Sequence, residues 1–230
     1  SPYHIFLLFK RYSKELVNIN SYPIIRGIGN YFINKSSSIK GLHSGQKIED
    51  AFNNFASKKG YSKISDLEMP IVIPTVDILN SKEYIFSNIK RNDNSYIDNI
   101  SIGKSVHASC CFPGAFSPCK YKKHLFMDGG ILDNVPAQEV RNLGADKVIS
   151  ITFHSDDITS NSNVMDYIMK TIDIMGKQIS EKSLDSSDYI LDIYTDKCGL
   201  LDVQKLDSCF EYGYNSVINK IDEIKEILGI

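Results

Sequence analysis

Two runs of apolar, β-branched residues constrain this chain most: "MPIVIPTVDI" at 69–78 and "KVISITF" at 147–153. We interpret both runs as strands buried on both faces of a sheet, for which a high content of apolar, β-branched residues is typical. Shorter strands are expected at 83–88, 124–128 and 189–194, and helical spacing of apolar residues occurs at 1–16, 45–61, 101–112, 136–146, 163–182 and 203–228. Strands that alternate with helices predict an α/β fold with a mainly parallel central sheet flanked by helices.

The length and charge of the chain narrow the possible architectures and partners. With 230 residues, of which 42% are hydrophobic, the chain is long enough to bury a sizeable core, and residues 1–230 are expected to form a single domain. A net charge of -2 gives no indication of a nucleic-acid partner, since phosphate binding needs clustered positive charge. Three lysines do cluster, at Lys120, Lys122 and Lys123. We interpret them as a solvated loop, with a rim that attracts lipid headgroups as the alternative.

Cysteine and histidine spacing argues against disulfides and metals. The five cysteines include no CxxC pair, and the five histidines show neither HxxxH nor HExxH spacing. No metal site is therefore expected. No apolar run is long enough to span a membrane, and no signal peptide is visible. The sequence predicts a cytoplasmic or peripheral membrane location, with secretion left open because the native start need not be residue 1.

A candidate site lies in "LFMDGGILDNVP", residues 125–136. Asp128 ends a predicted strand and is followed by Gly129 and Gly130. Asp-Gly is a favourable turn pair, so one interpretation is that this segment is only a turn. The other is that Asp128 is held as half of a catalytic pair, because α/β sheets bind ligands beyond the carboxyl ends of their strands.

The segments around Asp128 favour the second interpretation. "ASCCFPGAFSP" (108–118) precedes it, Asn134 and Pro136 follow it, and "LGADKVISITF" (143–153) leads into the next core strand. With the opening helix "SPYHIFLLFK" and the strand at 69–78, the chain resembles the C-terminal part of the patatin-like phospholipase family over nearly its whole length.

This resemblance implies a lipid acyl hydrolase that uses a Ser–Asp dyad and no cofactor, with a lipid or phospholipid ester as substrate and peripheral membrane contact. It implies that Asp128 is the catalytic aspartate and that Gly129 and Gly130 are the glycines of its motif. A free aspartate, with a pKa near 3.9, is a poor base for an alcohol, and partial desolvation would improve it. With no third residue to orient it, the carboxylate must be aimed by the strand before it and the bare backbone after it.

Other residues are expected in supporting roles. Pro113 and Gly114 would shape the loop beside the dyad, and Asn134 would either hydrogen-bond back to the DGG turn or cap an ordinary turn. The remaining candidates are interpreted as structural: Ser109 and Ser117 at a helix end and a turn, Asp77 after its strand, Cys110 and Cys111 as small buried apolar residues, and His107 and His154 as core or surface histidines rather than a third catalytic residue.

The chain departs from the family in lacking a GxSxG elbow. "GYSKI" (60–64) and "GKSVH" (103–107) lack the last glycine, and "GLHSG" (41–45) has its serine in the wrong place. No glycine-rich oxyanion loop is evident either, since "GIGNYF" (27–32) precedes no clear core strand. We therefore expect an N-terminally incomplete fold, whose nucleophilic serine is not in this chain. One or two strand–helix units, of about 30 residues each, would precede residue 1.

Three explanations of this absence stay open: a fragment of a longer protein, a separate chain that completes the fold, or a naturally inactive relative. The last would be a non-catalytic lipid-binding module. A phosphate-binding enzyme is disfavoured, because no glycine-rich turn clearly bridges a strand and a helix. An isolated chain of this kind is expected to expose a sheet edge and a wide apolar face.

Overall fold

A computed structural model of the chain describes residues 2–16, 44–113, 115–155, 164–196, 198 and 203–230. These residues form two compact units, which are described separately. The aspartate unit comprises residues 15–131, and the C-terminal unit comprises residues 132–230 together with 1–14. That residues 1–230 form a single domain stays a prediction.

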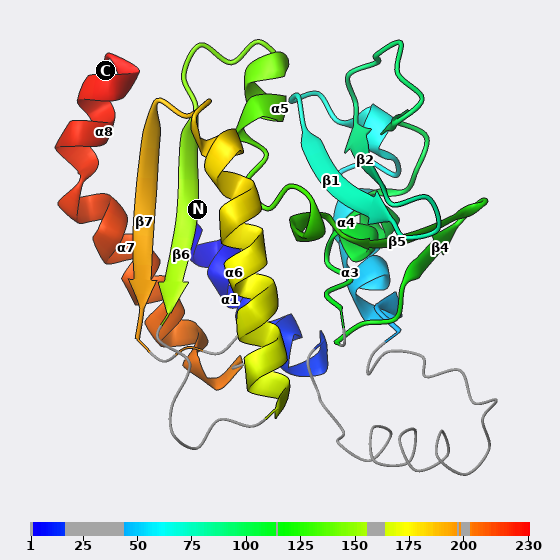
Figure 1. The fold of residues 1–230 in the computed structure, drawn as a ribbon, viewed down its shortest axis with the longest axis horizontal. Coiled ribbons are helices and arrows are strands. Elements are labelled where there is room, and N and C mark those ends of the chain that lie inside the picture. The colour runs from blue at the N-terminus through cyan, green and yellow to red at the C-terminus, as the bar shows by residue number, and fades with distance from the viewer. Residues whose placement is uncertain (1, 17–43, 114, 156–163, 197, 199–202) are drawn as a thin grey trace. The chain divides into compact units, whose positions relative to one another are not determined.

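The aspartate unit is built on a five-stranded sheet with the order β3-β2-β1-β5-β4 (Figure 1). Its strands are β1 (Val72–Asp77), β2 (Lys82–Ser87), β3 (Tyr96–Ile97), β4 (Cys119–Tyr121) and β5 (His124–Asp128). Three of the pairs are antiparallel, β1 with β2, β1 with β5 and β4 with β5, and β2 pairs with β3 in parallel.

The α/β class is therefore confirmed, but the strand directions in this sheet are mixed rather than mainly parallel. The reason lies in the short connections. Residues 78–81 join β1 to β2 and residues 122–123 join β4 to β5, whereas a parallel crossover needs a dozen residues or more. Two strands, β3 and β4, were not expected from the sequence, because each is too short to show a periodic pattern.

One helix packs directly on the sheet of the aspartate unit, and a second helix packs on the first. α4 (Ile102–Ser109) packs against β1 and β5, and α3 (Gln46–Ser57) packs on α4. The Ser101 hydroxyl accepts a hydrogen bond from the Lys104 amide and so caps the start of α4. In the core, the rings of Phe86 and Phe126 meet edge to face, with their centroids 5.4 Å apart. Short 3₁₀ turns occur at η1 (Ile64–Asp66) and η2 (Gly129–Ile131).

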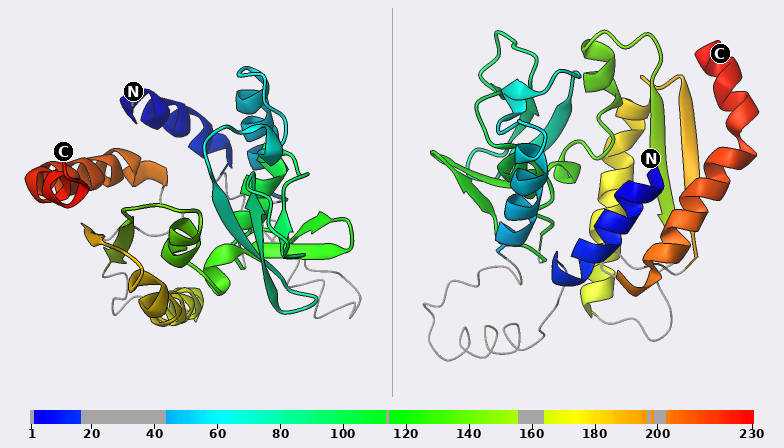
Figure 2. Two further views of the ribbon diagram at one scale, coloured as in Figure 1. Left: turned by 90° about the horizontal axis from the view of Figure 1, so that it is seen from above. Right: turned by 180° about the vertical axis from the view of Figure 1, so that it is seen from behind.

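The C-terminal unit contains a parallel pair, β6 (Ile149–Ser155) and β7 (Tyr189–Thr195), connected by α6 (Val164–Leu184). α5 (Ala137–Asn142) packs on α6, and α7 (Leu206–Asn219) lies along β7, as Figure 2 shows. α1 (Pro2–Leu16) contacts α7 through the rings of Phe6 and Phe210, whose centroids are 4.4 Å apart. The helix expected at 203–228 is interrupted, because η3 (Val203–Lys205) precedes α7 and the chain bends at Lys220 before α8 (Ile221–Leu228).

The expected open edge and apolar surface are found in the C-terminal unit. Within the described residues β6 pairs with β7 alone. Ile151 and Phe153, on the same face of β6, are 48% and 63% exposed. On α1, the apolar side chains of Ile5 and Phe9 are 69% and 53% exposed. The Phe6 side of α1 rests on α7.

Candidate active site

Asp128 is held by its backbone at the end of β5. It lies opposite Thr75 in the β1–β5 ladder, and the Thr75 hydroxyl donates to the Met127 carbonyl at 2.8 Å. On its other side, the Asp128 amide donates to the Cys111 carbonyl at 3.2 Å. Two separate elements, β1 and the segment after α4, thus fix the direction in which the half-buried Asp128 side chain leaves the strand.

The two glycines complete this arrangement in different ways. The Gly130 amide donates to Oδ1 of Asp128 at 2.8 Å, so the carboxylate caps the turn that follows it. Gly129 is buried, and a Cβ placed on it would lie 2.4 Å from the Pro74 carbonyl oxygen. Only glycine fits at this close approach of two backbone segments. The segment is therefore both a turn and a rigid support for the carboxylate.

The electrostatic environment of Asp128 favours a basic carboxylate. Burial raises the pKa of Asp128 above its ordinary value, and the hydrogen bond from Gly130 offsets only part of this effect. Among the residues that the structure describes, no lysine, arginine or histidine forms an ion pair with it. A desolvated carboxylate without a cationic partner accepts a proton more readily than an exposed one.

The end of α4 and the segment after it lie beside Asp128. The Ser109 hydroxyl donates to the Pro74 carbonyl at 2.7 Å, as expected of a helix-end role. Cys111 is fully buried, and its thiol donates to the His107 and Ser117 carbonyls. Cys110, in contrast, is exposed, so the prediction that both cysteines are buried was wrong for this one. Cys110 follows the last turn of α4, where the side chain leaves the packed face.

The supporting roles expected of Pro113, Gly114 and Asn134 stay predictions. Pro113 lies half-buried in a turn, whereas Gly114 lies outside the described residues. Asn134 is exposed and belongs to the C-terminal unit, so its hydrogen bond to the DGG turn stays a prediction.

The two candidate histidines and the serine of "GKSVH" contact residues other than Asp128. Nδ1 of His107 lies 3.2 Å from Oε2 of Glu49, and Nε2 of His154 lies 2.8 Å from Oδ1 of Asp192. The serine of "GKSVH", Ser105, is fully buried and donates to the Ile102 carbonyl. It is therefore a helix residue and not an exposed nucleophile. The "GIGNYF" segment lies outside the described residues.

One buried pair on the strand that carries Asp128 was missed by sequence reasoning. Asp77 is fully buried, and Oδ2 of its carboxylate lies 2.7 Å from Nδ1 of His124, at the start of β5. The Leu79 and Leu125 amides and the Asn80 side chain also donate to this carboxylate. Burial opposes ionisation of Asp77, but these hydrogen bonds prevail and lower its pKa. Asp77 was correctly taken as structural, while nothing in the sequence indicated its partner 47 residues away.

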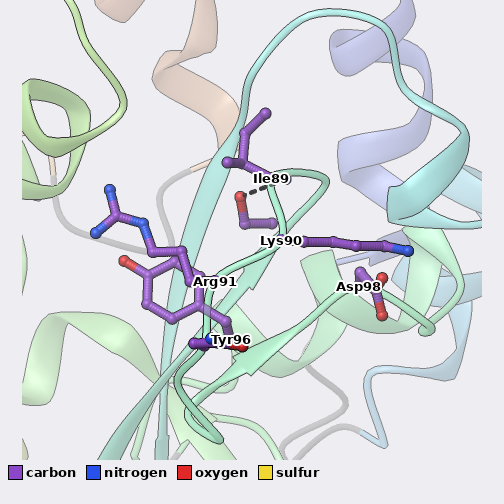
Figure 3. A pocket seen from close by; sticks show the side chains of 7 residues that line it. Ile89, Lys90, Arg91, Tyr96 and Asp98 are labelled. Atoms are coloured by element: carbon purple, nitrogen blue, oxygen red, sulfur yellow. Dashed lines mark hydrogen bonds between the residues drawn. The ribbon is translucent and has the colours of Figure 1, made fainter.

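A surface depression of about 550 Å³ lies elsewhere in the aspartate unit (Figure 3). It is lined by Ser87, Ile89, Lys90, Arg91, Asn92, Tyr96 and Asp98. The Arg91 guanidinium stacks over the Tyr96 ring at 5.2 Å. Neither Asp128 nor its turn lines this depression, so we do not assign it to the candidate active site.

Within the described parts of the chain, no three histidine, cysteine, aspartate or glutamate side chains gather closely enough to hold a metal ion. Among the described helices, none combines the length and the apolar character needed to cross a lipid bilayer.

Comparison with known proteins points to one family. The sequence model described as "Patatin-like phospholipase" matches residues 9–141. A Drosophila melanogaster protein named neuropathy target esterase sws is 31% identical over 133 residues, which is 57% of this chain and 8% of that protein. Patatin-like phospholipase domain-containing protein 7 of Mus musculus is 31% identical over 130 residues, or 56% of this chain and 9% of that protein. The chain therefore matches less than a tenth of the length of these two relatives.

Proposed function

Because this chain belongs to the patatin-like phospholipase family, we propose that it supplies the general base and part of the scaffold of a lipid acyl hydrolase. The base is Asp128, acting in a Ser–Asp dyad. The chain contains no GxSxG sequence, so the serine would come from outside residues 1–230. The substrate class is an acyl ester of a lipid or phospholipid.

The proposed chemistry follows the general course of acyl transfer. The Asp128 carboxylate accepts the proton of the serine hydroxyl as the serine oxygen attacks the ester carbonyl. The tetrahedral intermediate collapses, the alcohol leaves with a proton, and an acyl-serine remains. Water then attacks the acyl-serine, with Asp128 again accepting the proton, and the fatty acid is released. No metal or organic cofactor takes part.

One observation carries this proposal: the carboxylate of Asp128 is half-buried, its pKa is raised by burial, and its direction is fixed by backbone hydrogen bonds. A carboxylate with no orienting third residue needs such a support to act as a base. The names of the relatives, an esterase and a phospholipase domain protein, agree with ester hydrolysis.

The second candidate is a catalytically inactive lipid-binding module with the same fold. It is favoured by the lack of a nucleophile elbow in the sequence. In that case the protein would bind a lipid without cleaving its ester.

The test uses the complete protein that contains residues 1–230. Hydrolysis of a short-chain nitrophenyl ester is measured for the wild type, for Asp128→Asn and for Asp146→Asn, a control with an exposed aspartate. Labelling by a fluorophosphonate probe reports the serine independently. We expect Asp128→Asn to reduce hydrolysis at least about 1,000-fold, within the range seen when a general base is removed, while Asp146→Asn keeps wild-type activity.

Wild-type turnover by Asp128→Asn would refute the dyad. A complete protein that neither hydrolyses the ester nor takes up the probe would refute the hydrolase. If it still bound a fluorescent fatty acyl lipid, the inactive module would be supported instead.

A further inference from the structure

Two hairpin turns lie at the end of the five-stranded sheet opposite Asp128. The turn between β1 and β2 carries Ile78 and Leu79, which are 40% and 63% exposed, and is followed by the exposed Lys82. The turn between β4 and β5 carries Lys122 and Lys123, both exposed. Figure 1 shows the β4–β5 hairpin projecting from its sheet. Neither turn has a role in the proposed dyad.

Specific contacts hold the two turns side by side. The Ile78 amide donates to the Leu125 carbonyl at 3.0 Å, and the buried Asp77–His124 pair lies directly beneath. The ring of Tyr84 contacts both sides, since its centroid is 4.7 Å from the His124 ring and 5.7 Å from the Lys82 ammonium. The apolar turn and the basic turn therefore form one surface, built on a buried polar anchor.

This tip surface, defined by Ile78, Leu79, Lys82, Lys120, Lys122 and Lys123, is basic around an apolar centre. All four lysines are exposed. Asp93 lies close enough to Lys82 for their charges to interact, and Glu83 is half-buried, so two acidic groups offset part of the positive charge. The balance is positive, although the chain as a whole has a net charge of -2.

We propose that the tip surface docks on an anionic lipid bilayer. Ile78 and Leu79 enter the boundary between headgroups and acyl chains, and the flexible lysines contact anionic headgroups around them. Two aliphatic side chains bordered by long cationic ones match the layering of a bilayer, with its apolar interior below a negative surface. A solvated loop explains the lysines alone, but it leaves the exposed Leu79 beside them unexplained.

The proposal goes beyond the dyad and does not depend on it. Strand β5 separates Lys123, just before its start, from Asp128 at its end. The tip surface therefore acts as an anchor at a distance from the carboxylate and does not deliver substrate directly. Binding and hydrolysis can be measured separately for this reason.

The experiment is co-sedimentation of the complete protein with vesicles of phosphatidylcholine, with and without phosphatidylserine. We expect binding that requires phosphatidylserine and weakens as salt is raised. Lys122→Gln/Lys123→Gln should weaken binding roughly 25-fold, about fivefold for each lysine near an anionic surface. The matched control is Lys58→Gln/Lys59→Gln, another adjacent pair of exposed lysines, which should bind as the wild type does.

Two further variants test the apolar part of the tip surface. Leu79→Ser should weaken binding about tenfold, as expected when one aliphatic side chain no longer enters the interface. Met69→Ser, a change at another exposed apolar side chain of the same unit (75% exposed), should have no effect. Circular dichroism establishes that each variant is folded.

Equal binding to both kinds of vesicle, or equal loss in the two lysine pairs, would overturn the proposal. Asp128→Asn should bind vesicles normally. A wild type that binds vesicles but does not hydrolyse the soluble nitrophenyl ester would therefore refute the hydrolase and leave the docking surface intact.

Discussion

Asp77 and His124 form a buried carboxylate–imidazole pair that joins the end of β1 to the start of β5, the strand that carries Asp128. The pair lies at one end of β5 and the candidate base at the other. The first function of this pair is to fix the register of β5 against β1, because a shift by one residue would turn every side chain of the strand to the opposite face.

Removal of the Asp77 carboxylate is expected to destabilise the fold strongly. Asp77→Ala leaves His124 and the Leu79 and Leu125 amides without their acceptor in a buried site. We expect a loss of about 3–5 kcal/mol in the free energy of unfolding, measured in urea. Asp50→Ala, at an exposed helix position, should stay within about 0.5 kcal/mol of the wild type. Similar values for the two variants would contradict the structural role of the pair.

The same carboxylate predicts how stability depends on pH. The pKa of Asp77 is lowered in the folded state, despite the opposing effect of burial. Its contribution is therefore fully present above the unfolded-state pKa, near 3.9, and is lost as the pH falls through the lower folded-state pKa. Urea unfolding midpoints measured across this acidic window should fall more steeply with decreasing pH for the wild type than for Asp77→Asn, whose amide does not titrate.

The contribution of Asp128 to stability is expected to depend on pH in the opposite direction to that of Asp77. Burial raises its pKa in the folded state, so the ionised carboxylate opposes folding at neutral pH. Asp128→Asn can keep the hydrogen bond from Gly130 while it removes this charge. We expect the variant to be as stable as the wild type or more stable at pH 7, although it has lost activity, as often occurs at strained functional residues. A clear loss of stability would show that the carboxylate is a structural group.

Gly129→Ala is expected to distort the turn that supports Asp128. The added Cβ would lie 2.4 Å from the Pro74 carbonyl oxygen. Because this oxygen belongs to the backbone, it cannot move aside as a flexible side chain could. We expect a loss of about 1–3 kcal/mol in unfolding free energy, together with lower hydrolysis by the complete protein. Gly213→Ala is the control: no atom lies within 4 Å of its added Cβ, and in the middle of α7 it should stabilise by about 0.5–1 kcal/mol.

The exposed edge of β6 is expected to drive self-association of the isolated 230-residue chain. Phe153 is 63% exposed on a strand that pairs on one side only within the described residues. Phe153→Lys places a charge on this edge and should raise the monomer fraction in size-exclusion chromatography with light scattering. Leu228→Lys, at an exposed helix position, tests whether added charge alone is responsible. An equal gain from both changes would exclude the strand edge as the cause.

Periodicity and local signals located most elements. The bounds expected for β5, at 124–128, agree with the structure, and those of α6 and β7 agree to within two residues. The errors occurred where the local sequence pattern was weak or fitted more than one kind of structure. The three-residue strand β4 was not recognised.

The sequence alone determined the strand that ends in Asp128, the two glycines after it and the family to which they point, because these depend on residue types a few positions apart. The tertiary structure decided what surrounds them: mixed strand directions, the Asp77–His124 pair, and the two turns that the Ile78–Leu125 hydrogen bond joins. Such contacts join residues more than 40 positions apart. They arise from strand register and burial, which act between segments and leave no periodic signal within either one.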